Sequence, residues 1–118
     1  MTAINVPTRD TVSPNNQALF DALQGQLGFV PNLYATLAHS ENALGTYLAL
    51  QSAKSSINAK AREVVNLVVS QVNECEYCLA AHTALGKMNG FTDSQILDIR
   101  AGGAAFDAKL DALAKLTR

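Results

Sequence analysis

Apolar residues recur at helical spacing along most of the chain, and glycine or proline separates the segments that carry them. Ser13-Pro14 is typical of an N-cap followed by proline in the first turn, and Gly28 is a stop signal. The sequence therefore predicts a first helix between these two signals. The leucines expected on its buried stripe are Leu19, Leu23 and Leu27.

Two short helices are expected next. Pro31 can open a helix that reaches Leu37. Ser40 is the predicted N-cap of the following helix, because Glu41 then lies in the first turn, where the helix dipole favours an anion. The apolar residues expected along one side of this helix are Leu44, Tyr47 and Leu48.

The most apolar segment follows Asn58, the predicted N-cap of a helix that reaches Val72. Valine-rich runs also suit strands, but the flanking residues 59–63 favour a helix. Because apolar residues cover most of its circumference, we expect this helix at the centre of the fold. These residues are Ala61, Val64, Val65, Leu67, Val68, Val69 and Val72.

Three further helices complete the prediction of an all-α fold. The first of them follows the cysteine segment and ends at Asn89-Gly90. The second begins with a capping box from Thr92 to Gln95 and ends at Gly102-Gly103. The last helix runs toward the C-terminus. The apolar residues expected to face the core are Ile96, Leu97, Ile99, Phe106, Leu110, Leu113 and Ala114.

Composition narrows the function. The 118 residues are 48% hydrophobic and 16% charged, with a formal net charge of −1, which suits one globular domain. The absence of a Lys/Arg cluster argues against binding of nucleic acid. No apolar run is long enough for a membrane span. The first ten residues have no basic segment followed by an apolar one, so we expect a cytoplasmic protein. So few charges also predict self-association.

Both cysteines lie in the segment Glu74-Cys75-Glu76-Tyr77-Cys78-Leu79-Ala80-Ala81-His82, which allows three interpretations. A structural disulfide would close a loop too short to gain much chain entropy, and a cytosolic chain would not keep it oxidised. Zinc could use Cys75 and Cys78 with His82 as a third ligand, although the chain has no second pair of such ligands.

Redox chemistry is the third interpretation. The free N–H groups and the dipole of a helix N-terminus stabilise a thiolate there. The partner thiol can then close a disulfide without movement of the backbone. His82 lies four residues after Cys78 and therefore on the same helix face, within reach of its sulfur directly or through one water.

Glu63 is a less obvious candidate, twelve residues before Cys75. It could be an exposed carboxylate near a helix N-terminus that pairs with Lys60. It could instead face the cysteine motif, where a half-buried carboxylate would pass protons to His82. His39, the other histidine, is interpreted as a hydrogen-bonded residue at a helix end.

The sequence from Ser70 to Thr83, together with Glu63, resembles the core of the alkyl hydroperoxidase D-like (AhpD-like) family, within the carboxymuconolactone decarboxylase superfamily. The segments Gly28-Phe29-Val30-Pro31-Asn32-Leu33 and Leu37-Ala38-His39-Ser40 look like the upstream part of its peroxidase-related branch. The resemblance runs from about residue 27 to residue 118. Its specific part is the pattern Glu…Cys-x-x-Cys-x-x-x-His.

The resemblance implies an all-helical bundle that forms homo-oligomers, trimers or hexamers, and reduces hydroperoxides with thiols. It implies that Cys78 is oxidised to the sulfenic acid and that Cys75 is the proton donor and resolving thiol. It further implies that His82 and Glu63 form the proton relay. No organic or metal cofactor is implied, and the reductant would be a thiol or a protein of unknown identity.

The chain departs from the family at two places. Founding members have a histidine where Tyr77 stands, and we expect Tyr77 to pack beside the thiols rather than to join the relay. Members often continue beyond the end of this chain, so the expected single domain over residues 1–118 could lack a C-terminal helix. The decarboxylases of the superfamily lack the cysteine pair, which disfavours lactone decarboxylation.

Two other function classes stay open at this point. The protein could be a disulfide reductase or adaptor that regenerates a separate peroxidase. It could also be a non-enzymatic helical assembly module, with or without zinc.

Overall fold

The computed structural model describes residues 3–118. The prediction of a cytoplasmic protein rests on the first ten residues, and residues 1 and 2 of these lie outside the described part. This part of the chain is all helical, as predicted, and contains no strand. Contacts divide it into two compact units, residues 1–54 and 55–118. None of its helices is both long enough and apolar enough to cross a membrane.

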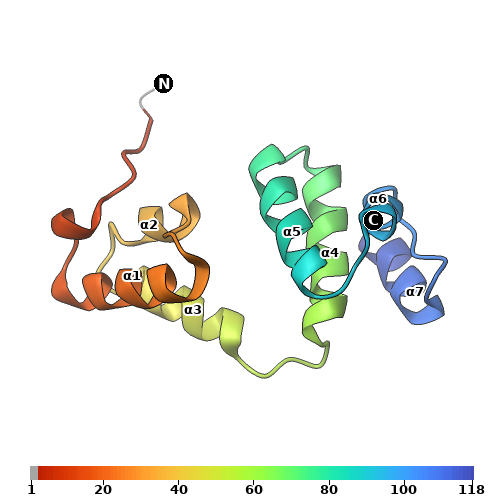
Figure 1. Cartoon of the computed structure of the whole chain (residues 1–118), viewed down its shortest axis with the longest axis horizontal. Coiled ribbons are helices and arrows are strands. Elements are labelled where there is room, and N and C mark those ends of the chain that lie inside the picture. Colours follow the sequence, from red (N-terminus) through yellow and green to blue (C-terminus); the bar gives the residue numbers. More distant parts are fainter. Residues whose placement is uncertain (1–2) are drawn as a thin grey trace. The chain divides into compact units, whose positions relative to one another are not determined.

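The first unit contains a short 3-10 helix and three α-helices (Figure 1). Ser13 caps the first α-helix through the N–H of Asn16, and Gly28 ends it in a left-handed conformation, as the sequence predicts. The elements are η1 (Arg9–Thr11), α1 (Pro14–Leu27), α2 (Asn32–Leu37) and α3 (Ala43–Ser52). The core of this unit consists of Val12, Phe20, Ala35, Ala38 and Leu44.

Two predictions for the first unit are wrong in detail. Leu27 is exposed because it lies in the last turn of α1, whereas Phe20 is buried in the core. Helix α3 begins after Asn42 rather than after Ser40. The Ser40 hydroxyl still accepts hydrogen bonds from the N–H groups of Asn42 and Ala43, so this side chain closes a turn ahead of the helix.

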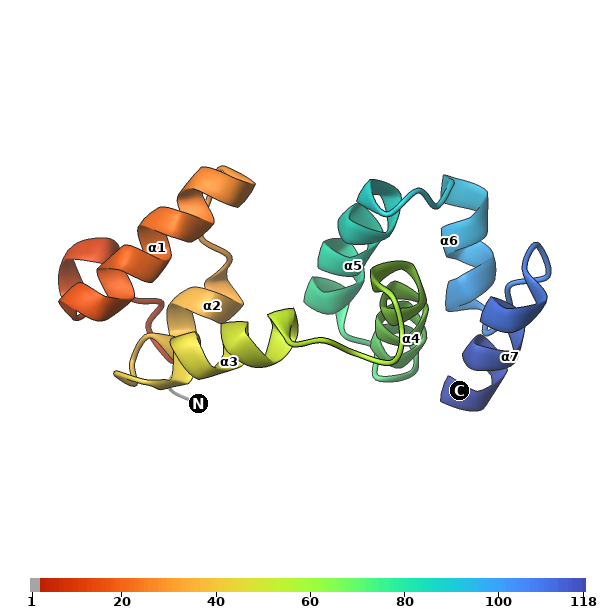
Figure 2. The ribbon, with the colours of Figure 1, turned by 90° about the horizontal axis from the view of Figure 1, so that it is seen from below.

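The second unit is built around α4, which contacts each of the three other helices of the unit. Figures 1 and 2 both show α5 beside α4. Asn58 caps α4 through the N–H of Ala61, and Thr92 and Gln95 form the predicted capping box of α6. The helices are α4 (Ala59–Val72), α5 (Glu76–Met88), α6 (Asp93–Arg100) and α7 (Ala108–Thr117).

The core of the second unit confirms the central place of α4. Its buried members are Val64, Leu67, Val68, Phe91, Ile96, Ile99, Ala104 and Ala114. The apolar residues of α4 are not all buried, however, because Val69 and Val72 are exposed. Leu97 is exposed as well, and Phe106 precedes α7 instead of lying within it.

Helix α7 is held against the preceding loop by Asp111. Its carboxylate accepts a hydrogen bond of 2.8 Å from the N–H of Ala104. This hydrogen bond, and then the contact with Lys115, hold the pKa of Asp111 below its usual value. Helix α7 also packs on α4.

Helices α4, α5 and α6 end in the same backbone turn. The residue of positive φ is Gly90 after α5 and Gly102 after α6, but it is Glu74, with φ 53°, after α4. In each turn the residue after the one of positive φ donates its N–H to the carbonyl of the residue five positions earlier. After α4 this hydrogen bond runs from Cys75 to Ser70 and is 3.0 Å long. This turn therefore places Cys75 directly at the start of α5.

We expect Glu74→Gly to raise the free energy of unfolding by about 0.5–1 kcal/mol. The left-handed conformation costs an L-residue roughly 1–2 kcal/mol, which exceeds the greater entropy that glycine loses on folding, about 0.5–1 kcal/mol. Urea unfolding measures the change as a higher midpoint at constant slope. Glu76→Gly, in the first turn of α5, is the control and should lower stability. An unchanged or lower midpoint for Glu74→Gly would contradict the assignment of strain to this residue.

Candidate active site

The two cysteines are joined at the N-terminus of α5. Cys75 is the N-cap residue, and its Sγ accepts a hydrogen bond of 3.3 Å from the N–H of Cys78. The structure records the pair as a disulfide with its Cα atoms 5.3 Å apart. The predicted placement of the motif at a helix start is confirmed. A sulfur at this position is close to the positive end of the helix dipole, which favours a thiolate when the pair is reduced.

Glu63 and His82 form a hydrogen-bonded pair between α4 and α5. The distance from His82 Nδ1 to Glu63 Oε2 is 2.8 Å, and the side chains are 26% and 8% exposed, respectively. An ionised carboxylate can only accept a hydrogen bond, so Nδ1 is the donor in this contact, and Nε2 is the unprotonated nitrogen whenever the ring is neutral. Burial and the fixed partner therefore hold the imidazole in one orientation.

The structure thus decides between the two placements of Glu63. The exposed carboxylate paired with Lys60 is wrong: the ammonium of Lys60 lies 4.8 Å from the centre of the Phe91 ring, and Glu63 is buried. The helical register explains this result. Glu63 lies beside Val64 and one turn before Leu67, on the side of α4 that packs against other helices of the unit.

His82 and Cys78 are both on α5, four residues apart. Four residues span about 6 Å along a helix axis and return to the same face. The imidazole therefore lies one turn beyond Cys78, and its hydrogen bond to Glu63 links α5 to α4. A nucleophile, a base and a group that orients the base are the elements of an activated thiol.

One polar residue of this site was missed by the sequence analysis. Asn66 lies one turn after Glu63, and its Nδ2 donates a hydrogen bond of 3.2 Å to Glu63 Oε1. Asparagine is a poor helix former, and its place in the middle of the most apolar helix was a signal that could have been used.

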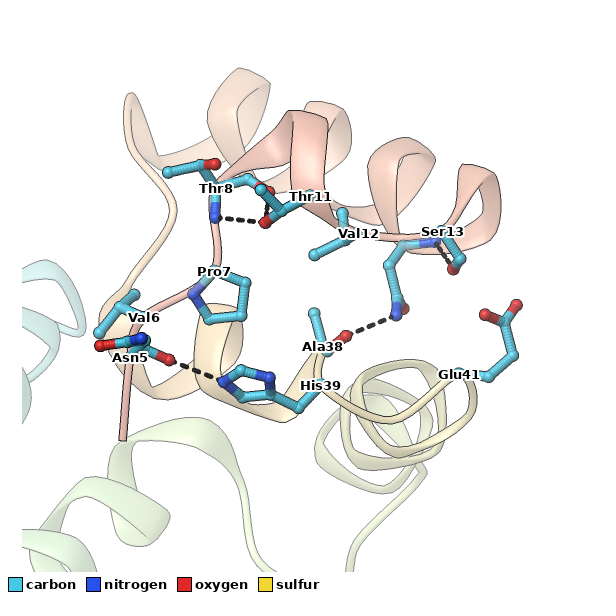
Figure 3. A pocket seen from close by; sticks show the side chains of 11 residues that line it. Asn5, Val6, Pro7, Thr8, Thr11, Val12, Ser13, Ala38, His39 and Glu41 are labelled. Carbon is cyan, nitrogen blue, oxygen red and sulfur yellow. Dashed lines mark hydrogen bonds between the residues drawn. The ribbon is translucent and has the colours of Figure 1, made fainter. Parts of the chain in front are cut away.

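Two other residues that the sequence singles out are not members of the Glu63–His82 pair. Tyr77 is 50% exposed beside Cys78, so its ring is less covered than expected of an aromatic that packs on the thiols. His39 belongs to the first unit, where its Nε2 lies 2.7 Å from the carbonyl of Asn5, as expected of a hydrogen-bonded histidine. Figure 3 shows this contact in a pocket of about 470 Å³ that the residues around η1 and the end of α2 line.

The arrangement gives the zinc alternative no support in residues 3–118. A structural zinc site needs four ligands. No group of three or more His, Cys, Asp or Glu side chains is gathered there in a way that could hold a metal ion.

The second unit thus combines a helical fold with a cysteine pair at the start of α5 and a histidine–glutamate pair between α4 and α5. The model of the carboxymuconolactone decarboxylase family matches residues 35–117, and the chain belongs to this family. The match begins in the first unit and covers nearly all of the second.

One curated relative comes from Bacillus subtilis (strain 168) and is described as "Uncharacterized protein YdfG". It is 38% identical over 48 residues, which are 41% of this chain and 33% of the relative. The chain therefore matches about a third of the length of this relative.

Proposed function

We propose that this protein is a thiol-dependent peroxidase that reduces hydroperoxides with Cys75 and Cys78. The observation that carries the proposal is the 2.8 Å contact between His82 and Glu63, one helical turn beyond Cys78. A structural disulfide needs neither an imidazole one turn further along its helix nor a buried carboxylate on the neighbouring helix that holds this imidazole. A thiol that must lose its proton to react does need such a base.

The proposed cycle begins with transfer of the Cys78 thiol proton to Nε2 of His82. The thiolate attacks the O–O bond, takes one oxygen and becomes a sulfenic acid, while the alcohol leaves with the proton that His82 returns. The Cys75 thiol then attacks the sulfur of the sulfenic acid, which releases water and forms the disulfide. An external dithiol donates two electrons and two protons and restores both thiols.

The proposal assigns distinct roles to the four residues. Cys78 is the nucleophile, Cys75 the resolving thiol, His82 the acid–base group, and Glu63 the carboxylate that orients His82 and stabilises its charged form. The resemblance of residues 28–40 supports placement in the peroxidase-related branch. We propose a cytoplasmic location, because thiol reductants there keep such a pair cycling.

Turnover with two oxidants tests this proposal. With dithiothreitol as reductant, the protein should consume tert-butyl hydroperoxide much faster than it reduces the disulfides of insulin. The reverse order would favour a disulfide reductase or an adaptor for a partner peroxidase. About one zinc per chain in protein purified without chelator, lost in Cys78→Ser, would favour the zinc-holding assembly module instead.

We also propose that the protein is a homo-oligomer. Val69 and Val72 present apolar surface on the central helix, and the chain carries few charges. Burial of such surface between copies removes it from water at about 25 cal/mol per Å². Sedimentation at micromolar concentration should give a trimer or hexamer. A 12.5 kDa monomer under these conditions would contradict the prediction.

A further inference from the structure

A stripe of polar residues runs along α4 toward the cysteine pair. Glu63, Asn66 and Ser70 lie three and four residues apart, so they share one face of the helix. Glu63 and Ser70 are buried, and Asn66 is half-buried. Asparagine and serine are both unfavourable inside helices, so their alignment here calls for a reason beyond helix formation.

The hydrogen bonds of this stripe connect it to both parts of the site. The Ser70 hydroxyl donates to the Asn66 carbonyl at 2.6 Å, and the Ser70 carbonyl accepts from the N–H of Cys75 at 3.0 Å. At its other end, the Asn66 amide donates to Glu63 Oε1. The turn of α4 that holds Asn66 therefore joins the Glu63 carboxylate to the start of α5.

The two oxygens of Glu63 have different donors. Asn66 Nδ2 is bonded to Oε1 at 3.2 Å and His82 Nδ1 to Oε2 at 2.8 Å. The last torsion of a glutamate side chain is broad and is not fixed by rotamer preference. A second donor on the other oxygen stops that rotation and holds Oε2 toward the imidazole.

We propose that Asn66 is a positioning residue for the Glu63–His82 pair, and that it thereby fixes the His82 tautomer with hydrogen on Nδ1. The side-chain amide of Asn66 is hydrogen-bonded to Glu63, and Asn66 acts through this carboxylate. The expected effect of Asn66 on catalysis rests on the proposed function, in which Nε2 of His82 takes the thiol proton of Cys78. Loss of Asn66 should then lower kcat about tenfold and leave KM within about twofold, because in this proposal Asn66 acts on the proton transfer and not on the binding of peroxide.

The ring nitrogens of His82 report on Asn66 without any activity measurement. The chain has two histidines, so nitrogen-15 NMR of labelled protein resolves His82 and keeps His39 as an internal reference. In the wild type, His82 should show hydrogen on Nδ1 and a slowly exchanging Nδ1 proton. Asn66→Leu, of similar size but without a donor, should mix the two tautomers and speed that exchange at least tenfold.

Further variants separate positioning from loss of structure. Asn66→Asp keeps the shape but replaces the donor with an acceptor, so it should disturb His82 as Asn66→Leu does, even if Asn66→Leu folds poorly. Asn66→Gln restores a donor amide and should recover part of the wild-type signal and rate. Gln71→Leu is the matched control on α4: it removes a hydrogen bond of 2.8 Å from Arg100 without touching Glu63, and it should leave His82 unchanged.

The positioning role of Asn66 and the proposed peroxidase function are contradicted by different results. Wild-type His82 signals in folded Asn66→Leu or Asn66→Asp protein would overturn the positioning role, whatever the activity. An equal disturbance of His82 in Gln71→Leu would also overturn it, because the effect would then belong to α4 as a whole. Changed His82 signals in a protein that does not reduce peroxide would support the positioning role and contradict the proposed function.

Discussion

Replacement of Cys75 by serine is expected to leave a stable sulfenic acid on Cys78 after exposure to peroxide, with no further turnover. Replacement of Cys78 should abolish the reaction and trap no sulfenic acid. In the first variant the nucleophile remains but has no thiol to condense with. In the second, the remaining thiol at Cys75 lies seven residues from His82, about 10 Å along the helix axis.

Two effects compete to decide which thiol reacts. Cys75 lies at the open end of α5, and its sulfur accepts the N–H of Cys78, which stabilises charge on Cys75. Such dipole and amide effects are worth about 1 kcal/mol at an exposed helix end. A base in reach of Cys78 contributes more, about two to four orders of magnitude in rate. The base should therefore decide the order, and Cys78 should be the peroxide-reactive thiol.

A dimedone-type probe followed by mass spectrometry of peptides measures this directly. The label should appear on Cys78 in Cys75→Ser. The Cys75→Ser/His82→Ala double variant should be labelled about a hundredfold more slowly, at the lower end of what loss of a general base costs. The Cys75→Ser/Cys78→Ser variant, which lacks both cysteines, is the negative control for labelling. Label on Cys75 in Cys78→Ser, with none in Cys75→Ser, would reverse the assignment and give the order known for thioredoxin-like helices.

Replacement of Glu63 by glutamine should slow peroxide turnover more than tenfold with little change in stability. Glutamine has the shape of glutamate and can still accept a hydrogen bond from His82, so the α4–α5 contact should survive. It carries no charge, however, and cannot stabilise the imidazolium that forms when His82 takes the thiol proton. The loss should therefore appear in the rate of Cys78 oxidation under single-turnover conditions.

Glu76→Gln is the matched control for this variant. It removes the same charge from the first turn of α5, beside the thiols, but from an exposed side chain. Its rate should stay within about threefold of the wild type, because dipole effects at such a position are small. Equal rates for Glu63→Gln and the wild type would leave Glu63 as a structural partner of His82 without a role in proton transfer.

Much of the helical architecture could be predicted because local signals agree with the fold. Ser13-Pro14, Asn58 and the Thr92–Gln95 box each satisfy N–H groups within a few residues in sequence, so the helix starts need no tertiary information. Ser40 failed as a cap because its hydroxyl satisfies the same kind of donor in a turn just before the helix.

Burial was harder to predict than helix position. A periodic stripe shows which side of a helix is apolar, but not how far along that side the neighbouring helices reach. Leu27 and Leu97 are both exposed although each belongs to an apolar stripe. The left-handed conformation of Glu74 was also missed, because glycine usually marks such a turn and here the two other turns of the unit have it.

The site was partly readable from the sequence for a similar reason. Cys75, Cys78 and His82 belong to one helix, so their spacing alone places Cys78 beside Cys75 at the helix start and His82 one turn beyond Cys78. Glu63 is nineteen residues from His82, and only the packing of α4 on α5 brings its carboxylate to the imidazole. The role proposed for Asn66 could not be predicted without that contact. Its side-chain amide is hydrogen-bonded to Glu63, and the sequence alone leaves open whether Glu63 is exposed or faces the cysteine motif.

The most direct test of the central claim is the mass of the fully reduced protein after one equivalent of tert-butyl hydroperoxide. We predict a loss of two hydrogens per chain, located to the peptide that contains Cys75 and Cys78, with one alcohol formed per disulfide. Chains that keep the reduced mass while the peroxide remains would contradict the account. A gain of oxygen on a methionine, with both thiols still free, would contradict it equally.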